Sequence, residues 1–205
     1  MNNKHYIAIA MALAFLGPLP LFSDGPWKVK KNRNGITVET RKADGYDVDE
    51  FKASATLDMP FDKAVEILRD VPNYTQWMYK LLVSKTVSET SPQSKVVYMK
   101  LDLPWPARDR DMYVRTTETL DEKKGFFESS SVGVDGYPQS ECIRMKRVTI
   151  TWTLTGVGSD KSKTHVVYSS KGDPSGKLPA WICNLGSVDG PYENLSNLKF
   201  KYRKN

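Results

Sequence analysis

The sequence contains little of the histidine and cysteine on which metal sites and nucleophilic catalysis depend. It has two histidines and two cysteines among 205 residues, and Cys142 and Cys183 lack the close pairing of a zinc site. A catalytic triad would depend on His165, which stands in no recognisable motif. We therefore expect no metal or other cofactor and no enzymatic activity. The two cysteines either pair in an oxidising compartment or remain free thiols.

Two other absences narrow the class of partner. Glycines stand singly at turns, and no glycine-rich phosphate loop is present. The chain has 30 Lys and Arg residues against 24 Asp and Glu, a formal net charge of +6, but the basic residues are scattered among acidic ones. No strand pattern shows the paired aromatics of an RNA-stacking surface. Nucleotides and nucleic acids are therefore not expected as partners, whereas weak attraction to an anionic surface fits the charge.

Long apolar runs are absent except at the N-terminus. There, Lys4 precedes an apolar stretch at residues 7–22, and the small residue Ser23 follows it. Gly17, Pro18 and Pro20 interrupt the stretch and leave it short for a membrane span of about 20 residues. We interpret residues 1–23 as a signal peptide cleaved near Ser23, with a retained membrane anchor as the alternative. The mature chain, residues 24–205, would then be exported to the periplasm.

The mature chain begins with strand signals and one short helix. Asn34-Gly35 predicts a turn between two strands, and a further strand is expected at about residues 47–57. Pro60 suits the start of a helix, and Val71-Pro72 ends its apolar periodicity. Strand patterns then follow one after another, with no helical pattern between them, at about residues 81–89, 94–103, 110–120, 125–132, 140–147, 148–155 and 164–172. This predicts a long antiparallel meander.

The last part of the chain returns to helical spacing. Leu178, Trp181, Ile182 and Leu185 recur at helical intervals, and the pattern resumes beyond a bend expected between Gly186 and Pro191. Together these elements predict a single α+β domain, in which a strongly curved antiparallel sheet wraps around a long C-terminal helix. Large sheets that curl around one helix commonly leave a hydrophobic cavity between them.

Four sequence stretches, in this order, resemble the START family of lipid-transfer domains. They begin with Trp27 and the Gly-Ile-Thr-Val stretch at residues 35–38, and continue with Leu-Arg-Asp at 68–70 followed by Tyr74 and Trp77. The most specific are Pro-Trp-Pro-Ala-Arg-Asp-Arg-Asp at 104–111 and Asp-Pro-Ser-Gly-Lys-Leu-Pro-Ala-Trp at 173–181. The resemblance spans residues 27–200. It implies a helix-grip fold that binds one lipid or other apolar ligand without a cofactor.

The resemblance also marks one departure. Phosphocholine-binding relatives place an arginine in the cavity wall where this chain has Thr116, and an acidic partner where it has Leu120. Recognition of phosphocholine through that pair is therefore not expected here. We expect a monomer that binds a lipid or hydrophobic small molecule, carries or senses it, and makes transient contact with a membrane surface. The basic residues Lys199, Lys201, Arg203 and Lys204 are candidates for that contact.

Alternation along the strands and periodicity in the helix predict which residues bind the ligand. These are Met99, Leu101, Met112, Val114, Thr116, Glu118, Trp181, Ile182, Leu185 and Leu195. The same residues could instead make a filled core without a cavity. Glu118 would lie either at the strand end in water or inside, bonded to a ligand hydroxyl. The competing function is a cyclase-like or dehydratase-like enzyme, for which only Glu118, Tyr98 and Tyr168 offer acid or base groups.

Overall fold

The computed structural model describes residues 25–201. The predicted signal peptide at residues 1–23 lies outside this range, as do Arg203 and Lys204 of the basic tail. Within residues 25–201, no helix is both long enough and apolar enough to cross a membrane.

The order of elements follows the sequence patterns closely. The sheet strands are β1 (Lys28–Arg33), β2 (Ile36–Arg41), β3 (Glu50–Leu57), β4 (Leu81–Ser91), β5 (Ser94–Leu101), β6 (Arg110–Asp121), β7 (Phe126–Gly133), β8 (Ile143–Arg144), β9 (Val148–Val157) and β10 (Lys163–Gly172). The helical elements are α1 (Phe61–Arg69), η1 (Val71–Gln76), α2 (Ala180–Asn184), η2 (Leu185–Asp189) and α3 (Gly190–Lys201).

The ten strands form one open sheet, in which nine are antiparallel neighbours in the order β1-β2-β3-β10-β9-β7-β6-β5-β4 and the short β8 pairs with β6. The predicted meander is confirmed, because β4, β5, β6, β7, β9 and β10 are each paired with the next in this series. The predicted strand at residues 140–147 is wrong in extent, since only Ile143 and Arg144 pair, in parallel with β6. Side-chain bonds hold much of this segment instead, including those of Ser140 and Arg144 to Asp111.

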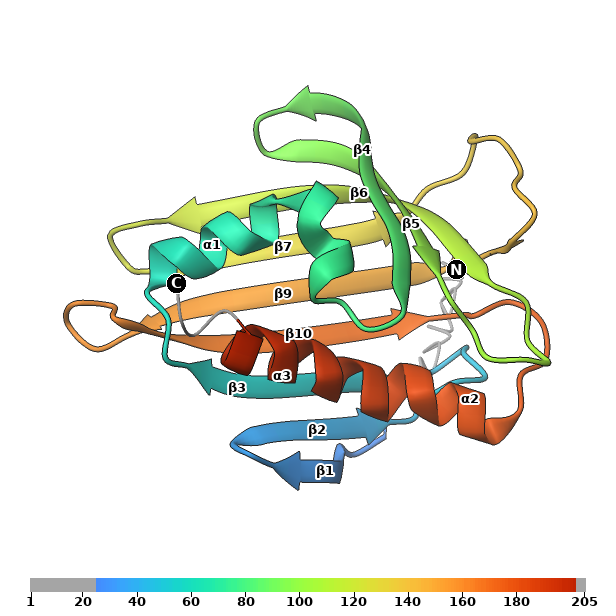
Figure 1. The fold of residues 1–205 in the computed structure, drawn as a ribbon, viewed down its shortest axis with the longest axis horizontal. Helices are drawn as coiled ribbons and strands as arrows, with labels where there is room; N and C mark the ends of the chain where they lie inside the picture. The colour runs from blue at the N-terminus through green and yellow to red at the C-terminus, as the bar shows by residue number, and fades with distance from the viewer. Residues whose placement is uncertain (1–24, 202–205) are drawn as a thin grey trace, which may run out of the picture.

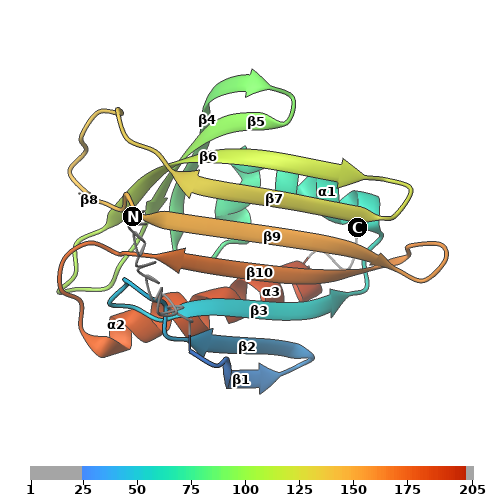
Figure 2. The ribbon, with the colours of Figure 1, turned by 180° about the vertical axis from the view of Figure 1, so that it is seen from behind.

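The helices lie on one face of the curved sheet. Figure 1 shows α1 and the α2–α3 helical segment crossing the concave side, and the view from behind in Figure 2 shows the opposite face without a covering helix. This asymmetry explains the alternation in the strands. On β2, for example, Ile36, Val38 and Thr40 are buried while the residues between them are half-buried. The helix-grip architecture is thus confirmed.

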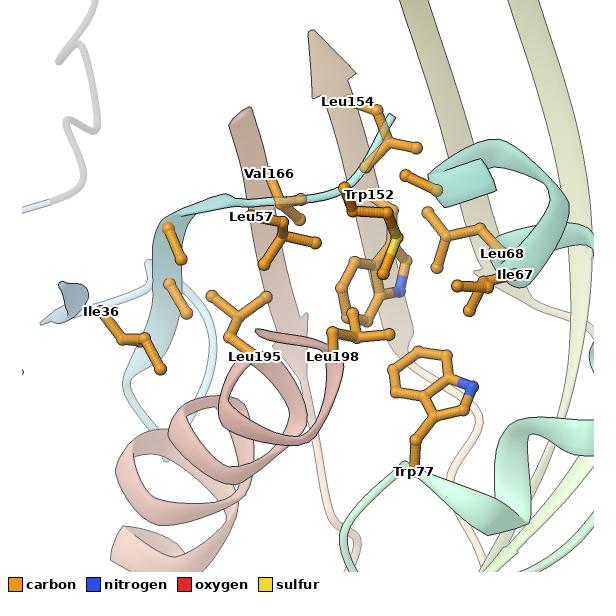
Figure 3. Packing of buried hydrophobic residues seen from close by; sticks show 14 of the residues in the cluster. Ile36, Leu57, Ile67, Leu68, Trp77, Trp152, Leu154, Val166, Leu195 and Leu198 are labelled. Atoms are coloured by element: carbon orange, nitrogen blue, oxygen red, sulfur yellow. The ribbon is translucent and has the colours of Figure 1, made fainter. Parts of the chain in front are cut away.

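One end of the concave side is filled by a compact core. Leu195 and Leu198 of α3 pack among Leu57, Leu154 and Val166 of the sheet, and Trp77 closes the group from the η1 side (Figure 3). The Trp77 and Trp152 rings meet edge to face at 5.7 Å between centroids. This packing fixes α3 firmly against the sheet.

The C-terminal helical segment has two unlike halves joined by a π turn. In α2 only Ile182 is buried, whereas α3 buries Pro191, Tyr192, Asn194, Leu195 and Leu198. Asn194 Oδ1 accepts a 2.6 Å hydrogen bond from the Tyr79 backbone, and Asn197 Nδ2 donates to Trp77 O at 2.7 Å. The π turn at Leu185–Asp189 lies where the sequence predicts a bend.

The charged motif at residues 108–111 anchors loops, as its position after a proline-rich turn predicts. Arg110 donates to the backbone carbonyls of Pro174 at 2.7 Å and Ser175 at 3.0 Å, in the loop between β10 and α2. Asp111 accepts from Arg144 and Ser140. The motif therefore holds the two loops that flank one end of the sheet.

Candidate ligand-binding cavity

A cavity of about 260 Å³ lies between the concave face of the sheet and the C-terminal helical segment. Strands β3, β4, β5, β6, β7, β9 and β10 all contribute to its walls, and so do η1, α2, η2 and the first residues of α3. The volume is close to the lower end of the range of about 300 to 1,000 Å³ for small-molecule sites. The filled-core alternative is therefore wrong for this part of the molecule.

Most of the wall is aliphatic or sulfur-containing. The strands supply it through alternate residues, which share one face of the sheet because side chains alternate along each strand. The apolar lining includes Val71, Met78, Leu81, Val97, Met99, Leu101, Leu103, Met112, Met145, Val148, Ile150, Leu178, Ile182 and Leu185.

An aromatic group forms another part of the wall. The rings of Trp152 and Tyr168 stack at 3.9 Å between centroids, and Phe51 meets Tyr168 edge to face at 4.9 Å. Burial raises the pKa of the Tyr168 phenol, so that the hydroxyl remains protonated. Tyr74 also lines the cavity and donates to the Leu68 carbonyl. Burial, and then the negative charge of Glu118, raise the pKa of Tyr74.

A polar patch interrupts the apolar wall on β5, β6 and β7. Lys95 pairs across the sheet with Thr116, and Thr116 pairs with Ser131, so that the three side chains form one row on the cavity face. The hydroxyls of Thr116 and Ser131 lie 2.7 Å apart. Ser129 adds a third hydroxyl to the lining. This patch is the polar end of the cavity.

Glu118 lies beside the polar end but does not line the cavity. Its side chain is 3 % exposed; Arg69 Nε donates to Oε2 at 2.9 Å, and Lys95 Nζ lies 3.0 Å from Oε1. Neither expectation for Glu118 describes this arrangement. The carboxylate is neither in water at a strand end nor free to meet a ligand hydroxyl, because two cations hold it inside the protein.

Charged groups at the other end of the cavity, near Arg110, form ion pairs or hydrogen bonds with other residues of the chain. Lys80 donates to Asp102 at 2.7 Å, and Asp49 pairs with Lys42 at 2.9 Å. Arg110, which is buried, donates to the carbonyls that precede α2. Thr116 follows Arg110 by six residues on β6. At about 3.3 Å per residue the two ends are therefore about 20 Å apart.

Six of the ten residues predicted as ligand-binding line the cavity: Met99, Leu101, Met112, Thr116, Ile182 and Leu185. Val114, Glu118, Trp181 and Leu195 do not. Val114 and Leu195 are fully buried in the packed core, and Trp181 is 49 % exposed. On α2 the cavity is lined by Ile182 and Cys183, and Trp181 lies on the exposed side of the helix. The part that any of these residues plays in ligand binding stays a prediction.

Several lining residues were missed by sequence reasoning. Ile150 and Trp152 carry a recognisable signal, because they belong to the strict alternation of β9 that already marked one buried face. Lys95 and Ser131 carry no such signal, since a basic or hydroxyl residue within a strand usually faces water. Cys183 lines the cavity and Cys142 is buried, and both are free thiols. Within residues 25–201, no group of three His, Cys, Asp or Glu side chains could hold a metal ion.

The open sheet, the helix that lies across its concave face and the apolar cavity between them define the chain as a helix-grip, cavity-containing protein. A START domain profile matches residues 21–187. The chain therefore belongs to the START domain family.

Relatives agree with this assignment. An uncharacterized protein of Pseudomonas aeruginosa is 22 % identical over 174 residues, covering 84 % of this chain and 85 % of its own. The phosphatidylcholine transfer protein of Bos taurus is 24 % identical over 178 residues, covering 83 % and 81 %. A solved STAR-related lipid transfer protein of Xanthomonas axonopodis superposes with a TM-score of 0.76 at 27 % identity, covering 87 % of this chain and 99 % of its own. These relatives support the binding of a lipid or other hydrophobic ligand.

Proposed function

We propose that this protein binds one lipid or similar hydrophobic molecule in the cavity and carries or senses it without changing it chemically. The observation that supports this most strongly is the cavity of about 260 Å³ with predominantly apolar walls. Each Å² of apolar ligand surface kept from water contributes about 25 cal/mol. A lined cavity of this kind can therefore compete with a membrane for an apolar molecule.

The state of the polar groups favours a carrier over an enzyme. Asp49 and Asp102, the carboxylates in the lining, are paired with lysines. Tyr74 and Tyr168 have raised pKa values and so do not act as bases near neutral pH. Glu118, the acid or base on which the enzyme alternative depends, is held by two cations outside the lining.

The N-terminal half of the C-terminal helical segment closes the cavity in this proposal. Ile182 of α2, and Leu185 and Gly186 of the π turn, line the cavity, while the remaining residues of α2 are exposed or half-buried. α3 is tied to the sheet and to residues 77–79 by its core leucines and two asparagines. The ligand would therefore enter by movement of α2 about the π turn, with α3 fixed.

Contact with a membrane would occur at the end of the cavity near α2. Trp105 is 89 % exposed and follows Pro104, which lines the cavity, and exposed Trp181 stands next to Ile182. Tryptophan favours the interface between water and lipid. Lys199 and Lys201, two of the basic residues expected at the membrane, instead donate to the backbone carbonyls of Thr56 and Gln76.

Removing the exposed indole tests this contact. Trp105→Ala should slow the transfer of a fluorescent lipid between vesicles by several-fold without altering its equilibrium affinity, because Trp105 is outside the cavity lining. Val132→Ala, which removes an exposed apolar side chain from β7, is the control and should transfer at the normal rate. Equal transfer rates for the two variants would contradict the proposed contact.

We also propose that the protein is exported to the periplasm after cleavage of its signal peptide. The apolar stretch at residues 7–22 with Ser23 after it supports cleavage before Asp24. The N-terminal residue of the mature protein, determined from a periplasmic fraction, distinguishes a cleaved signal from a retained anchor.

Filling the cavity tests the proposed function. Ile150 lines the cavity from β9, and Thr151 next to it does not. Ile150→Trp should reduce the uptake of a fluorescent fatty acid by at least about tenfold, because the indole occupies ligand space. Thr151→Trp is the matched control. Thermal unfolding of both variants reports folding, and Ile150→Phe is the smaller replacement if the indole disrupts packing. Normal uptake by a folded Ile150→Trp protein would contradict the proposal.

A further inference from the structure

The polar end of the cavity offers hydrogen-bond donors that the protein does not use. The Lys95 ammonium has three N–H donors, and Glu118 Oε1 is its one ion-pair partner among the described residues. Of the Thr116 and Ser131 hydroxyls, one donates to the other, and the accepting hydroxyl keeps its own hydrogen. Ser129 makes no side-chain hydrogen bond within residues 25–201 and is 6 % exposed. These unused donors favour a ligand that accepts several hydrogen bonds.

The charges at the polar end of the cavity also favour a ligand that accepts hydrogen bonds. Two cations, Arg69 and Lys95, share the single carboxylate of Glu118. The cluster therefore carries one net positive charge. Lys95 is the member that lines the cavity, and its side chain is 15 % exposed. Burying a cation in a mainly apolar site costs free energy unless an anion balances its charge.

We propose that Lys95, with the hydroxyls of Thr116, Ser129 and Ser131, binds the anionic head group of a single-chain amphiphile. The head group is a carboxylate or a phosphate, each of which accepts several charge-assisted hydrogen bonds. This inference rests on the proposed function and specifies its ligand class. Thr116 and Ser131 orient the head group, and Lys95 supplies the charge.

The dimensions of the cavity suit one chain. The polar end lies about 20 Å along β6 from Arg110. One acyl chain spans about half of a bilayer hydrocarbon core of about 30 Å. A single chain with its head group at Lys95 would therefore extend along the apolar wall toward Leu103 and Leu178 at the other end.

No other charged group in the lining is as well placed. Lys80 is satisfied by Asp102. The guanidinium of Arg110 is occupied by three backbone carbonyls, those of Arg108, Pro174 and Ser175. Among the lining residues that the structure describes, Lys95 alone lies in a cluster of net positive charge and has hydroxyls beside it on the cavity face.

Four probes of defined head group test the proposal by competition with a fluorescent fatty acid: hexadecanoate, hexadecyl phosphate, hexadecanol and phosphatidylcholine. The native protein should bind the two anions at least about tenfold more tightly than the alcohol. Lys95→Met should weaken binding of the anions by roughly 10- to 100-fold, the effect expected for a hydrogen bond to a charged group, and leave the alcohol unchanged. Which anion binds better identifies the head group.

Lys85→Met is the matched control. Lys85 is an exposed cation on the neighbouring strand β4, packed over the Tyr98 ring outside the cavity lining. This variant should bind all four probes as the native protein does. If Lys95→Met does not fold, the double variant Lys95→Met/Glu118→Gln removes the carboxylate together with its partner and should show the same loss.

The outcomes separate this inference from the proposed function. Equal affinity for hexadecanoate and hexadecanol, or tight binding of phosphatidylcholine alone, would overturn the anionic head group and leave a hydrophobic-ligand carrier. Native-like affinity of folded Lys95→Met for both anions would also overturn it. Binding of none of the four probes would contradict the proposed function as well.

Discussion

Asp111 is a fully buried carboxylate on which the loops at one end of the sheet depend. Arg144 donates to both of its oxygens, at 2.7 and 3.0 Å, and Ser140 donates at 2.7 Å. Burial alone would raise the pKa of Asp111, but the hydrogen bonds from Arg144 and Ser140 outweigh it and hold the pKa below its ordinary range. The ion pair therefore contributes to stability only while Asp111 is charged.

Replacing Asp111 tests this role. Asp111→Asn should lower the free energy of unfolding by about 3 to 5 kcal/mol, because it leaves Arg144 buried without its charge partner. The native protein should lose stability as pH falls below about 4, where the unfolded chain binds the proton first, and this contribution should be constant above about pH 5. Urea unfolding from pH 3 to 7 measures both effects.

The control for this prediction is Asp135→Asn, since the Asp135–Lys146 pair is largely exposed. Its cost should be under about 1 kcal/mol. An Asp111→Asn protein as stable as this control would show that the buried pair does not hold the loops.

The residues of the polar end show which features the sequence predicts and which it does not. Alternation correctly places Thr116 and Glu118 on the inward face of β6, because that pattern depends only on the strand itself. Whether an inward residue meets a cavity, a core or an ion pair depends on the neighbouring strands and on α1. Arg69, which holds Glu118, comes from α1, and nothing local in the sequence relates the two. The pairing of Lys95 with Thr116 likewise depends on strand register.

At the scale of elements, most boundaries follow from turn residues and periodicity. Asn34-Gly35 forms the first turn, with positive φ at both residues, and Pro60 precedes the first turn of α1. Two segments depart from this expectation. Residues 140–147 form a loop tied to Asp111 instead of a full strand, and a π turn separates α2 from α3. The π turn changes the phase of the helix, so one periodic pattern does not predict which face of α2 turns inward.

The contrast between α2 and α3 leads to a prediction for their dynamics. Amide hydrogens of α2, Ala180–Asn184, should exchange at least about tenfold faster than those of α3, Gly190–Lys201, because α2 buries one side chain and α3 buries five. A bound fatty acid should slow exchange in α2 and leave α3 nearly unchanged. Hydrogen exchange with mass spectrometry measures this. Uniform exchange across both helices, with or without ligand, would contradict a gate confined to α2.

At the scale of the molecule, the sheet and helices leave a space that packing does not fill. The core around Trp77, Leu154 and Leu195 holds α3 in place, and the cavity occupies the adjoining part of the concave face. Membership of the START domain family and the lipid-transfer relatives agree with a binding role. The division between a packed core and a cavity is a property of the whole fold, and strand alternation alone does not reveal it.

Native mass spectrometry of the purified mature protein tests the central claim most directly. We expect one ligand per chain, released on denaturation as a molecule with a long apolar part, and absent from the Ile150→Trp variant. The mass of that ligand should be the same before and after incubation with fresh protein, because a carrier returns it unchanged. A protein that never retains a hydrophobic molecule when exposed to lipids, or that converts its ligand to a product of different mass, would contradict the account.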